Sequence, residues 1–140
     1  MPLNVYIPDN NKIIHETEVD FEIRFISKVI NLVQYDSGIP IVSVKLYSNG
    51  KKINLLETEN LMVRLRWSIK TNEYVYKDIL GVNETGDTAY FSIDSYMTKR
   101  PGTYNPILEL VELDEEENIA GSSPMIFIID RNPIQREWKE

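Results

Sequence analysis

The most regular alternation of apolar and polar residues in the chain covers residues 61–69. Every second position carries a large apolar side chain, and these residues are Leu61, Val63, Leu65, Trp67 and Ile69. Successive side chains of a β-strand point to opposite faces, so the pattern predicts a strand of an antiparallel sheet with one buried face. A shift of one residue would turn Arg64 and Arg66 into the core, which fixes the register. We therefore predict a central strand whose five apolar residues belong to the structural core, with Trp67 as its anchor.

Further segments with a β-type pattern are separated by turn signals. They cover residues 13–33, 41–48, 53–55, 74–80, 89–93, 104–113 and 124–130. The first is long enough for two strands separated near Ser27 and Lys28, or for one strand with a bulge, and both alternatives remain open. The last is so apolar that we expect both of its faces to be buried. About seven or eight short strands of this kind predict an all-β, antiparallel sandwich.

The segments between the strands contain several specific turn signals. Asn49-Gly50 is typical of a tight hairpin. Residues 94–98 fit one helical turn capped by Asp94. The sequence PGTY at 101–104 indicates a corner at which the chain changes sheets, with the hydroxyl of Tyr104 bonded back to the backbone. This predicts that Tyr104 belongs to the structural core.

Both ends of the chain are polar and are interrupted by residues that break strands. We predict an N-terminal arm over residues 1–12, one sandwich domain over 13–130 and a C-terminal tail over 131–140. Each end nevertheless carries isolated apolar or aromatic side chains, which are Leu3, Val5, Tyr6, Ile7, Ile134 and Trp138. Segments of this kind become ordered when they are laid across a neighbouring subunit, so these six residues are the candidate partner-binding residues.

Composition excludes several classes of function. The chain has 140 residues, of which 42% are hydrophobic, enough for one domain with a core. Its net charge of −7 argues against a nucleic-acid partner, and the absence of cysteine excludes disulfides and thiolate sites. No apolar run approaches the ~18–20 residues of a membrane span, and the N-terminus lacks a signal-peptide pattern. These features predict a soluble, non-exported protein with no membrane partner.

The residues that most often carry chemistry form no recognisable site. His15 is the only histidine, so a triad or a histidine-based metal site has no second member. The acidic run 114–117 lacks the ligand spacing of a calcium loop and is typical of a solvated hairpin tip. The glycines form no phosphate loop, and no serine lies in a G-x-S-x-G motif. We therefore predict no catalytic residue, no cofactor and no metal, and a protein that is not an enzyme.

A series of short motifs follows an order that is similar to a known family. They are 34–38 (QYDSG), 42–51 (VSVKLYSNGK), 63–67 (VRLRW), 75–78 (VYKD), 90–93 (YFSI), Met97, 101–104 (PGTY), 122–124 (SSP) and 130–135 (DRNPIQ). As an ordered set, they resemble the N-terminal domain of the phage baseplate upper protein family, over roughly residues 30–135. One departure is the sequence KTNE at 70–73, where the family often has a Lys-Pro-Asp-Gly turn.

The resemblance implies an immunoglobulin-like β-sandwich that serves as a structural or adaptor module of a bacteriophage virion. Domains of this family dock onto the particle and carry receptor-binding fibres. The implied partners are other virion proteins (baseplate, fibre or capsid subunits), with many copies in a symmetric assembly. The implied location is the virion, after synthesis in the host bacterial cytoplasm. Because the chain ends at Glu140 without a coiled-coil stem, we expect a free-standing adaptor, a tail or capsid decoration protein, or the ordered part of a fibre.

A second class of function stays open. β-Sandwiches also present loops and tyrosines to sugars, and five tyrosines lie between Arg66 and Pro106. They are Tyr74, Tyr76, Tyr90, Tyr96 and Tyr104. The alternative prediction is therefore a module that binds carbohydrate or the host surface.

Overall fold

The computed structural model describes residues 4–23, 28–36, 39–58, 60–70, 73–113 and 116–132. Every regular element within these ranges is a β-strand, and they contain no helix long and apolar enough to cross a membrane. The all-β sandwich predicted from the sequence is confirmed. Its strands are β1 to β12, more than the predicted number of about seven or eight, because some are only two or three residues long.

The first layer of the sandwich is a sheet with the strand order β1-β3-β8-β7, to which β4 adds by pairing with β3. Its strands are β1 (Ile13–Asp20), β3 (Pro40–Ser48), β4 (Lys51–Lys52), β7 (Gly81–Val82) and β8 (Thr88–Ser92). Asn49 and Gly50 join β3 to β4 with φ angles of 53° and 79°. A tight hairpin needs such positive angles, so the predicted turn is confirmed.

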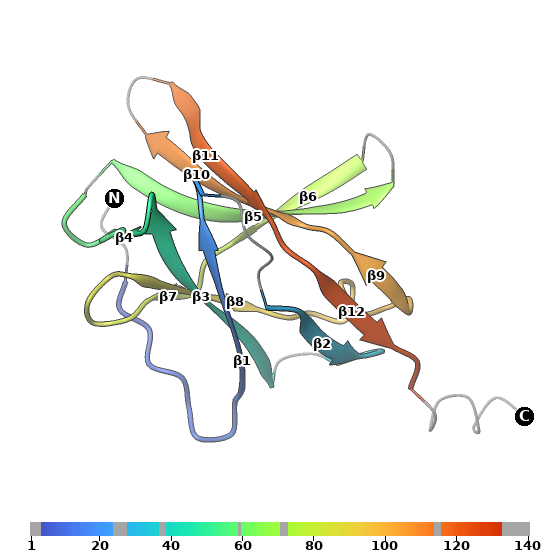
Figure 1. Cartoon of the computed structure of the whole chain (residues 1–140). Coiled ribbons are helices and arrows are strands. Elements are labelled where there is room, and N and C mark those ends of the chain that lie inside the picture. Colours follow the sequence, from blue (N-terminus) through green and yellow to red (C-terminus); the bar gives the residue numbers. More distant parts are fainter. Residues whose placement is uncertain are drawn as a thin grey trace, which may run out of the picture.

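The second layer combines two smaller sheets, β11-β10-β5-β6 and β2-β12-β9. Its strands are β2 (Ile30–Val33), β5 (Leu61–Lys70), β6 (Glu73–Asp78), β9 (Gly102–Tyr104), β10 (Ile107–Leu113), β11 (Glu117–Pro124) and β12 (Phe127–Asp130). One long hairpin belongs to both sheets, because β9 continues into β10 and β11 into β12 (Figure 1). Where these strands break, the Met125 N–H donates to the Pro106 carbonyl at 2.8 Å and holds the two sides of the hairpin together.

The sheets are mixed rather than purely antiparallel. β1 runs parallel to β3, and β2 runs parallel to β12. A parallel neighbour needs a crossover connection, which the chain makes by passing from the first layer to the second between β1 and β2. Of the two alternatives for residues 13–33, the structure has two separate strands, one in each layer.

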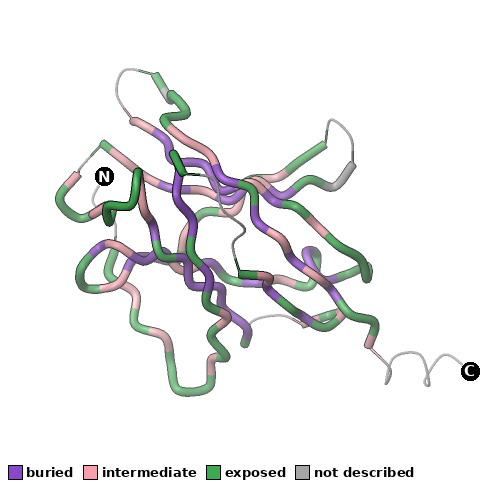
Figure 2. The backbone as a smooth tube through the Cα atoms, in the orientation of Figure 1, coloured by how far each residue is buried: buried purple, intermediate pink, exposed green. Residues whose placement is uncertain are grey.

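The core lies between the two layers and includes the inward face of β5. Val63, Leu65 and Trp67 are at most 3% exposed, and Leu61 and Tyr104 are half-buried against them. The Trp67 ring stacks on Tyr104 at 5.2 Å and meets the edge of Phe127 at 5.4 Å. The side chain of Ile69 lies outside the described residues. Figure 2 shows the buried residues within the strands and the exposed ones mainly in the connections.

Three local predictions are corrected. Pro124 ends β11 and the last strand begins only at Phe127, with Ile128 half-buried and Asp130 exposed, so its two faces are not both buried. Residues 94–98 form consecutive turns instead of a helical turn, although Asp94 does cap them, because its Oδ1 accepts from the Met97 N–H at 2.9 Å. The strand predicted at 53–55 is absent, because the return strand of this hairpin, β4, covers only Lys51–Lys52. Leu55 is nevertheless buried in the core.

Candidate functional site

The N-terminal arm lies against the edge of the first layer. Val5 forms a parallel bridge with Val82 of β7. The Tyr6 N–H donates to the Val82 carbonyl at 2.8 Å, and the Val82 N–H donates to the Asn4 carbonyl at 3.0 Å. Residues 4–6 thus cover backbone groups that an edge strand would otherwise present to another chain.

Gly81 makes room for this part of the arm. A Cβ atom at position 81 would lie 2.6 Å from the Asn4 carbonyl oxygen and 2.7 Å from the Tyr6 Cβ. Both distances are too short for real side chains, so only glycine fits beneath the arm. The Tyr6 ring also contacts the Tyr90 ring, with 5.5 Å between centroids.

The six candidate partner-binding residues therefore have different surroundings. Tyr6 is half-buried against its own sheet, whereas Val5 and Ile7 are 47% and 72% exposed. Leu3, Ile134 and Trp138 lie outside the described residues. In the described part of the arm, Val5 and Ile7 are the apolar side chains that another molecule could contact.

The outer face of β5 and β6 carries a ladder of arginines and tyrosines. The Arg64 guanidinium lies 3.8 Å from the centroid of the Tyr76 ring, and that of Arg66 lies 4.1 Å from the centroid of Tyr74. Arg64 also pairs with Glu109 of β10 through Nε and Oε1 at 3.0 Å. Burial raises the pKa of Tyr76, and the negative charge of Glu109 adds to this effect. Although Arg64 lies on the face of β5 opposite the core, its side chain is only 15% exposed, because Tyr76 and Glu109 cover it.

Two aspartates organise turns by accepting hydrogen bonds. Asp20 is buried at the end of β1 and accepts four backbone N–H groups at 2.8–3.0 Å, which belong to Glu22, Ile23, Asn49 and Gly50. Burial by itself raises the pKa of this carboxyl, but the four donors outweigh it and lower the pKa to about 2. Asp20 therefore fastens the end of β1 to the β3–β4 hairpin.

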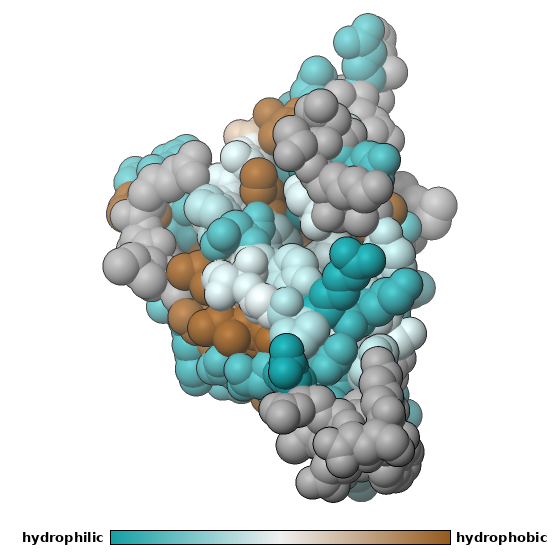
Figure 3. All heavy atoms as spheres, turned by 90° about the vertical axis from the view of Figure 1, so that its right-hand side faces the viewer, coloured by the Kyte–Doolittle hydropathy of each residue, from teal (hydrophilic) through white to brown (hydrophobic). Residues whose placement is uncertain are grey.

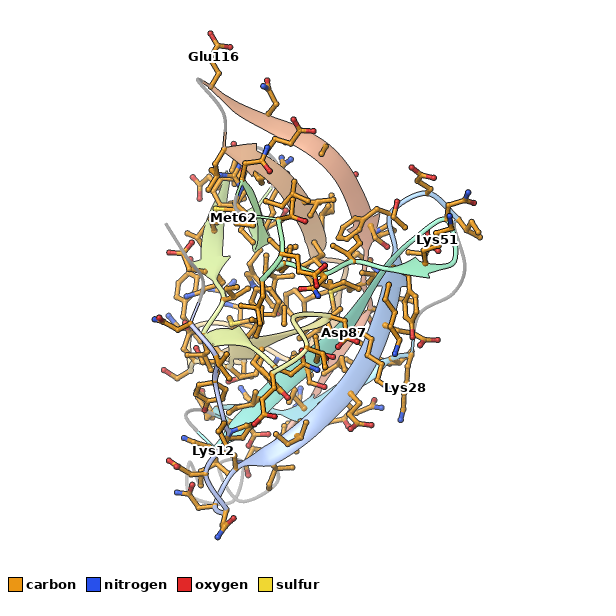
Figure 4. All side chains as sticks on the ribbon, turned by 90° about the vertical axis from the view of Figure 1, so that its left-hand side faces the viewer. Lys12, Lys28, Lys51, Met62, Asp87 and Glu116 are labelled. Carbon is orange, nitrogen blue, oxygen red and sulfur yellow. The ribbon has the colours of Figure 1, made fainter. Side chains whose placement is uncertain are left out.

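Asp87 likewise holds a turn together, the one that precedes β8, and Figure 4 labels its position. Its Oδ1 accepts from Asn83 Nδ2 at 2.8 Å and from the hydroxyl groups of Thr85 and Thr88 at 3.0 and 3.2 Å, and Lys52 lies 3.6 Å from Oδ2. Burial by itself would raise the pKa of Asp87, but its side-chain hydrogen bonds and the nearby charge of Lys52 outweigh burial and bring the pKa below its ordinary value. Since these donors occupy the carboxylate, Asp87 stabilises the turn rather than offering a free base.

The described residues contain no group of three or more histidines, cysteines and carboxylates that could hold a metal ion. His15 lies in β1, half-buried, and pairs in register with Val42. Glu116 is exposed at the tip of the long hairpin and points away from the body of the molecule (Figure 4). Asp114 and Glu115 of the acidic run lie outside the described residues.

Comparisons with known proteins give a likeness to a solved structure. No protein-family model matches the chain, and no curated protein matches it. Among solved structures, the N-terminal domain of phage TP901-1 ORF48 superposes with a TM-score of 0.65. The match covers 84% of this chain and 98% of that domain, at 10% sequence identity. The two chains share a fold.

Proposed function

We propose that the protein is a non-enzymatic structural or adaptor component of a bacteriophage particle. The observation that carries the proposal is the likeness to a phage protein domain over 84% of this chain and 98% of that domain. The ordered motifs that resemble the phage baseplate upper protein family support the same assignment. The assignment is made by analogy of fold, and incorporation into phage particles tests it directly.

Within this role, we assign the chain to a baseplate, to the attachment of a tail or capsid fibre, or to the decoration of the particle surface. We also propose that the sandwich is immunoglobulin-like, as the family resemblance implies. Its partners would be other virion proteins, contacted by several symmetry-related copies. Two acidic side chains with lowered pKa values, Asp20 and Asp87, stabilise turns, so these groups fit a structural protein better than an enzyme.

The surface supports a docking role. Seen from the side on which β6, β9 and β12 lie, it is largely polar, with one larger compact apolar patch and several small apolar spots (Figure 3). Compact exposed apolar patches often mark protein contacts. The exposed Val5 and Ile7 of the N-terminal arm add a second apolar contact at the edge of the first layer. In our proposal, Leu3, Ile134 and Trp138 extend these contacts.

Purified particles give the test. Mass spectrometry of phage particles should detect the protein at a fixed stoichiometry. The variant Val5→Thr/Ile7→Thr should keep its melting temperature within a few degrees but enter particles less efficiently. Ile119→Thr, which changes an exposed residue of β11, is the matched control and should be incorporated normally. Absence of the protein from purified particles would contradict the proposal.

A carbohydrate- or host-surface-binding role is the alternative. It is favoured by Tyr74 and Tyr76 of β6, which as residues are 43% and 38% exposed although Arg66 and Arg64 each lie over one face of their rings. Exposed aromatic rings of this kind offer stacking surfaces. A glycan array separates the two roles, because saturable glycan binding without particle incorporation supports the alternative only.

A further inference from the structure

A cavity of about 180 Å³ opens between the end of β5, residues 96–100 and β9. Its main lining residues are Trp67, Tyr96, Met97, Lys99, Arg100 and Tyr104. We name it the corner pocket, because the chain turns here from β8 towards the long hairpin.

The floor of the corner pocket is apolar and aromatic. Trp67 and Tyr104 stack with 28° between their ring planes, and the T-shaped contact of Trp67 with Phe127 fixes the indole from the other direction. Met97 is 1% exposed. These side chains are packed into the core, so the floor keeps its shape when the pocket is empty or filled.

The rim of the corner pocket is cationic. Lys99 and Arg100 are exposed, and no carboxylate in the described part of the chain lies within 4.0 Å of either side-chain charge. Tyr96, also on the rim, is 47% exposed. None of the residues that line the pocket is acidic, although the whole chain has a net charge of −7. The corner pocket is thus a local cationic site on an acidic protein.

The backbone beneath the rim is firmly anchored. Thr98 is fully buried, and its hydroxyl donates to the Asp36 carbonyl at 2.8 Å. Gln34 Nε2 donates to the Lys99 carbonyl at 3.1 Å, and the Tyr104 hydroxyl donates to the Arg100 carbonyl at 2.6 Å. Because the loop backbone is fixed before anything binds, a ligand has to order only the side chains of Lys99 and Arg100 and not the chain that carries them.

We propose that the corner pocket binds a carboxylate-bearing anchor of a partner protein, namely an acidic side chain next to an aromatic one. The partner's carboxylate would pair with Lys99 and Arg100, while its aromatic ring would lie against the exposed Tyr96 and the half-buried Tyr104, above the buried Trp67. A cavity of this size is smaller than the ~300–1,000 Å³ of pockets that hold whole small ligands, but it suits one anchor residue. Tyrosine and arginine, represented here by Tyr96 and Arg100, are also enriched at the energetic centres of protein interfaces. The identity of the partner as a protein rests on the proposed function.

Trp67 can report on binding directly. The chain has two tryptophans, so the full-length variant Trp138→Phe keeps Trp67 as the single one. The probe is the peptide acetyl-Glu-Phe-Asp-Phe-amide, and its control is acetyl-Gln-Phe-Asn-Phe-amide. We expect a saturable change in Trp67 fluorescence with the acidic peptide and at least about tenfold weaker binding of the neutral one, because the charge pairs are lost.

Charge reversal at the rim gives the matched comparison. In the Trp138→Phe background, Arg100→Glu should weaken binding of the acidic peptide about tenfold or more, whereas Lys51→Glu should leave it unchanged. Lys51 is an exposed lysine in β4, on the opposite side of the molecule from β9 (Figure 1). Thermal melting of each variant shows that it is folded.

Three results would overturn the proposal: no saturable binding of the acidic peptide, equal binding of both peptides, or equal losses in Arg100→Glu and Lys51→Glu. Saturable binding of 3′-sialyllactose without peptide binding would also overturn it and would make the pocket a glycan site. Particle incorporation is measured separately. If the wild-type protein enters particles but the peptide does not bind, only the proposal for the corner pocket is contradicted. If the peptide binds but the protein is absent from particles, only the proposed function is contradicted.

Discussion

The hydroxyl of Tyr104 donates a 2.6 Å hydrogen bond to the backbone carbonyl of Arg100, four residues earlier in the chain. The same ring stacks on Trp67 at 5.2 Å. One side chain therefore fixes the corner that precedes the long hairpin and also connects it to the core. Tyr104→Phe keeps the ring and removes only the hydroxyl. We expect it to lower the free energy of unfolding by about 0.5–1.5 kcal/mol, measured by urea denaturation. A loss above about 3 kcal/mol would show that the hydroxyl does more than close the corner.

Trp67 should be a major contributor to stability. It is 3% exposed and contacts aromatic rings from both β9 and β12. Trp67→Ala removes these contacts and leaves a cavity, so we expect a loss of roughly 3–5 kcal/mol in the free energy of unfolding. The control Tyr96→Ala removes an exposed ring and should change the free energy by about 0.5 kcal/mol or less. A loss below about 1 kcal/mol for Trp67→Ala would contradict the packing described above.

Gly81→Ala should detach the N-terminal arm from its sheet. The new Cβ would lie 2.6 Å from the Asn4 carbonyl oxygen, and backbone cannot move aside without giving up the bonds to Val82. Hydrogen exchange should therefore show lost protection at the amides of Tyr6 and Val82, while the amides between β3 and β8 stay protected. Gly50→Ala is the control, because its Cβ meets no atom within 4 Å and any cost comes only from its φ of 79°. Unchanged protection at Tyr6 in Gly81→Ala would show that the arm does not need this glycine.

Asp20 should make stability depend on acidic pH. Its carboxyl has a pKa of about 2 in the folded protein, compared with an ordinary value of 3.8. As the pH falls, the unfolded chain takes up this proton first, so the contribution of Asp20 is complete above about pH 4 and is lost between about pH 4 and pH 2. Asp20→Asn should lower the melting temperature at neutral pH and reduce the slope of stability in this window. Asp130→Asn, an exposed change in β12, controls for the loss of one negative charge.

The sequence predicts the strands with a strong alternation and misses those without one. β5 matches the predicted strand closely, because the apolar face of 61–69 leaves only one register that buries it. The sequence predicts no strand between 113 and 124, where β11 lies, since ENIAGSSP contains small and polar residues with no apolar face. β11 is an edge strand, and its partner β10 holds it in place through backbone bonds. Backbone pairing of this kind leaves little trace in composition.

Contacts between residues that are far apart in the sequence also escape prediction from sequence. Asp20 accepts from Asn49 and Gly50, which are 29 and 30 residues away, and no local pattern predicts that contact. The corner pocket likewise joins Trp67 to residues from a separate turn. The PGTY sequence does predict the corner and the backbone bond of Tyr104, because both are formed within a few residues. Local geometry is therefore predictable here, whereas the surfaces that depend on which strands become neighbours are not.

The position of β12 has a mechanical consequence. β12 lies between the parallel β2 and the antiparallel β9, and it is the last strand of the described chain. Tension applied through the C-terminal tail would act along β12 and load its hydrogen bonds to both neighbours in shear, all at once, instead of peeling them apart singly. A domain held in this way suits an anchorage that is pulled from its C-terminal end. When a single molecule is pulled between its two termini, the domain should unfold in one abrupt event at high force rather than in a series of small steps.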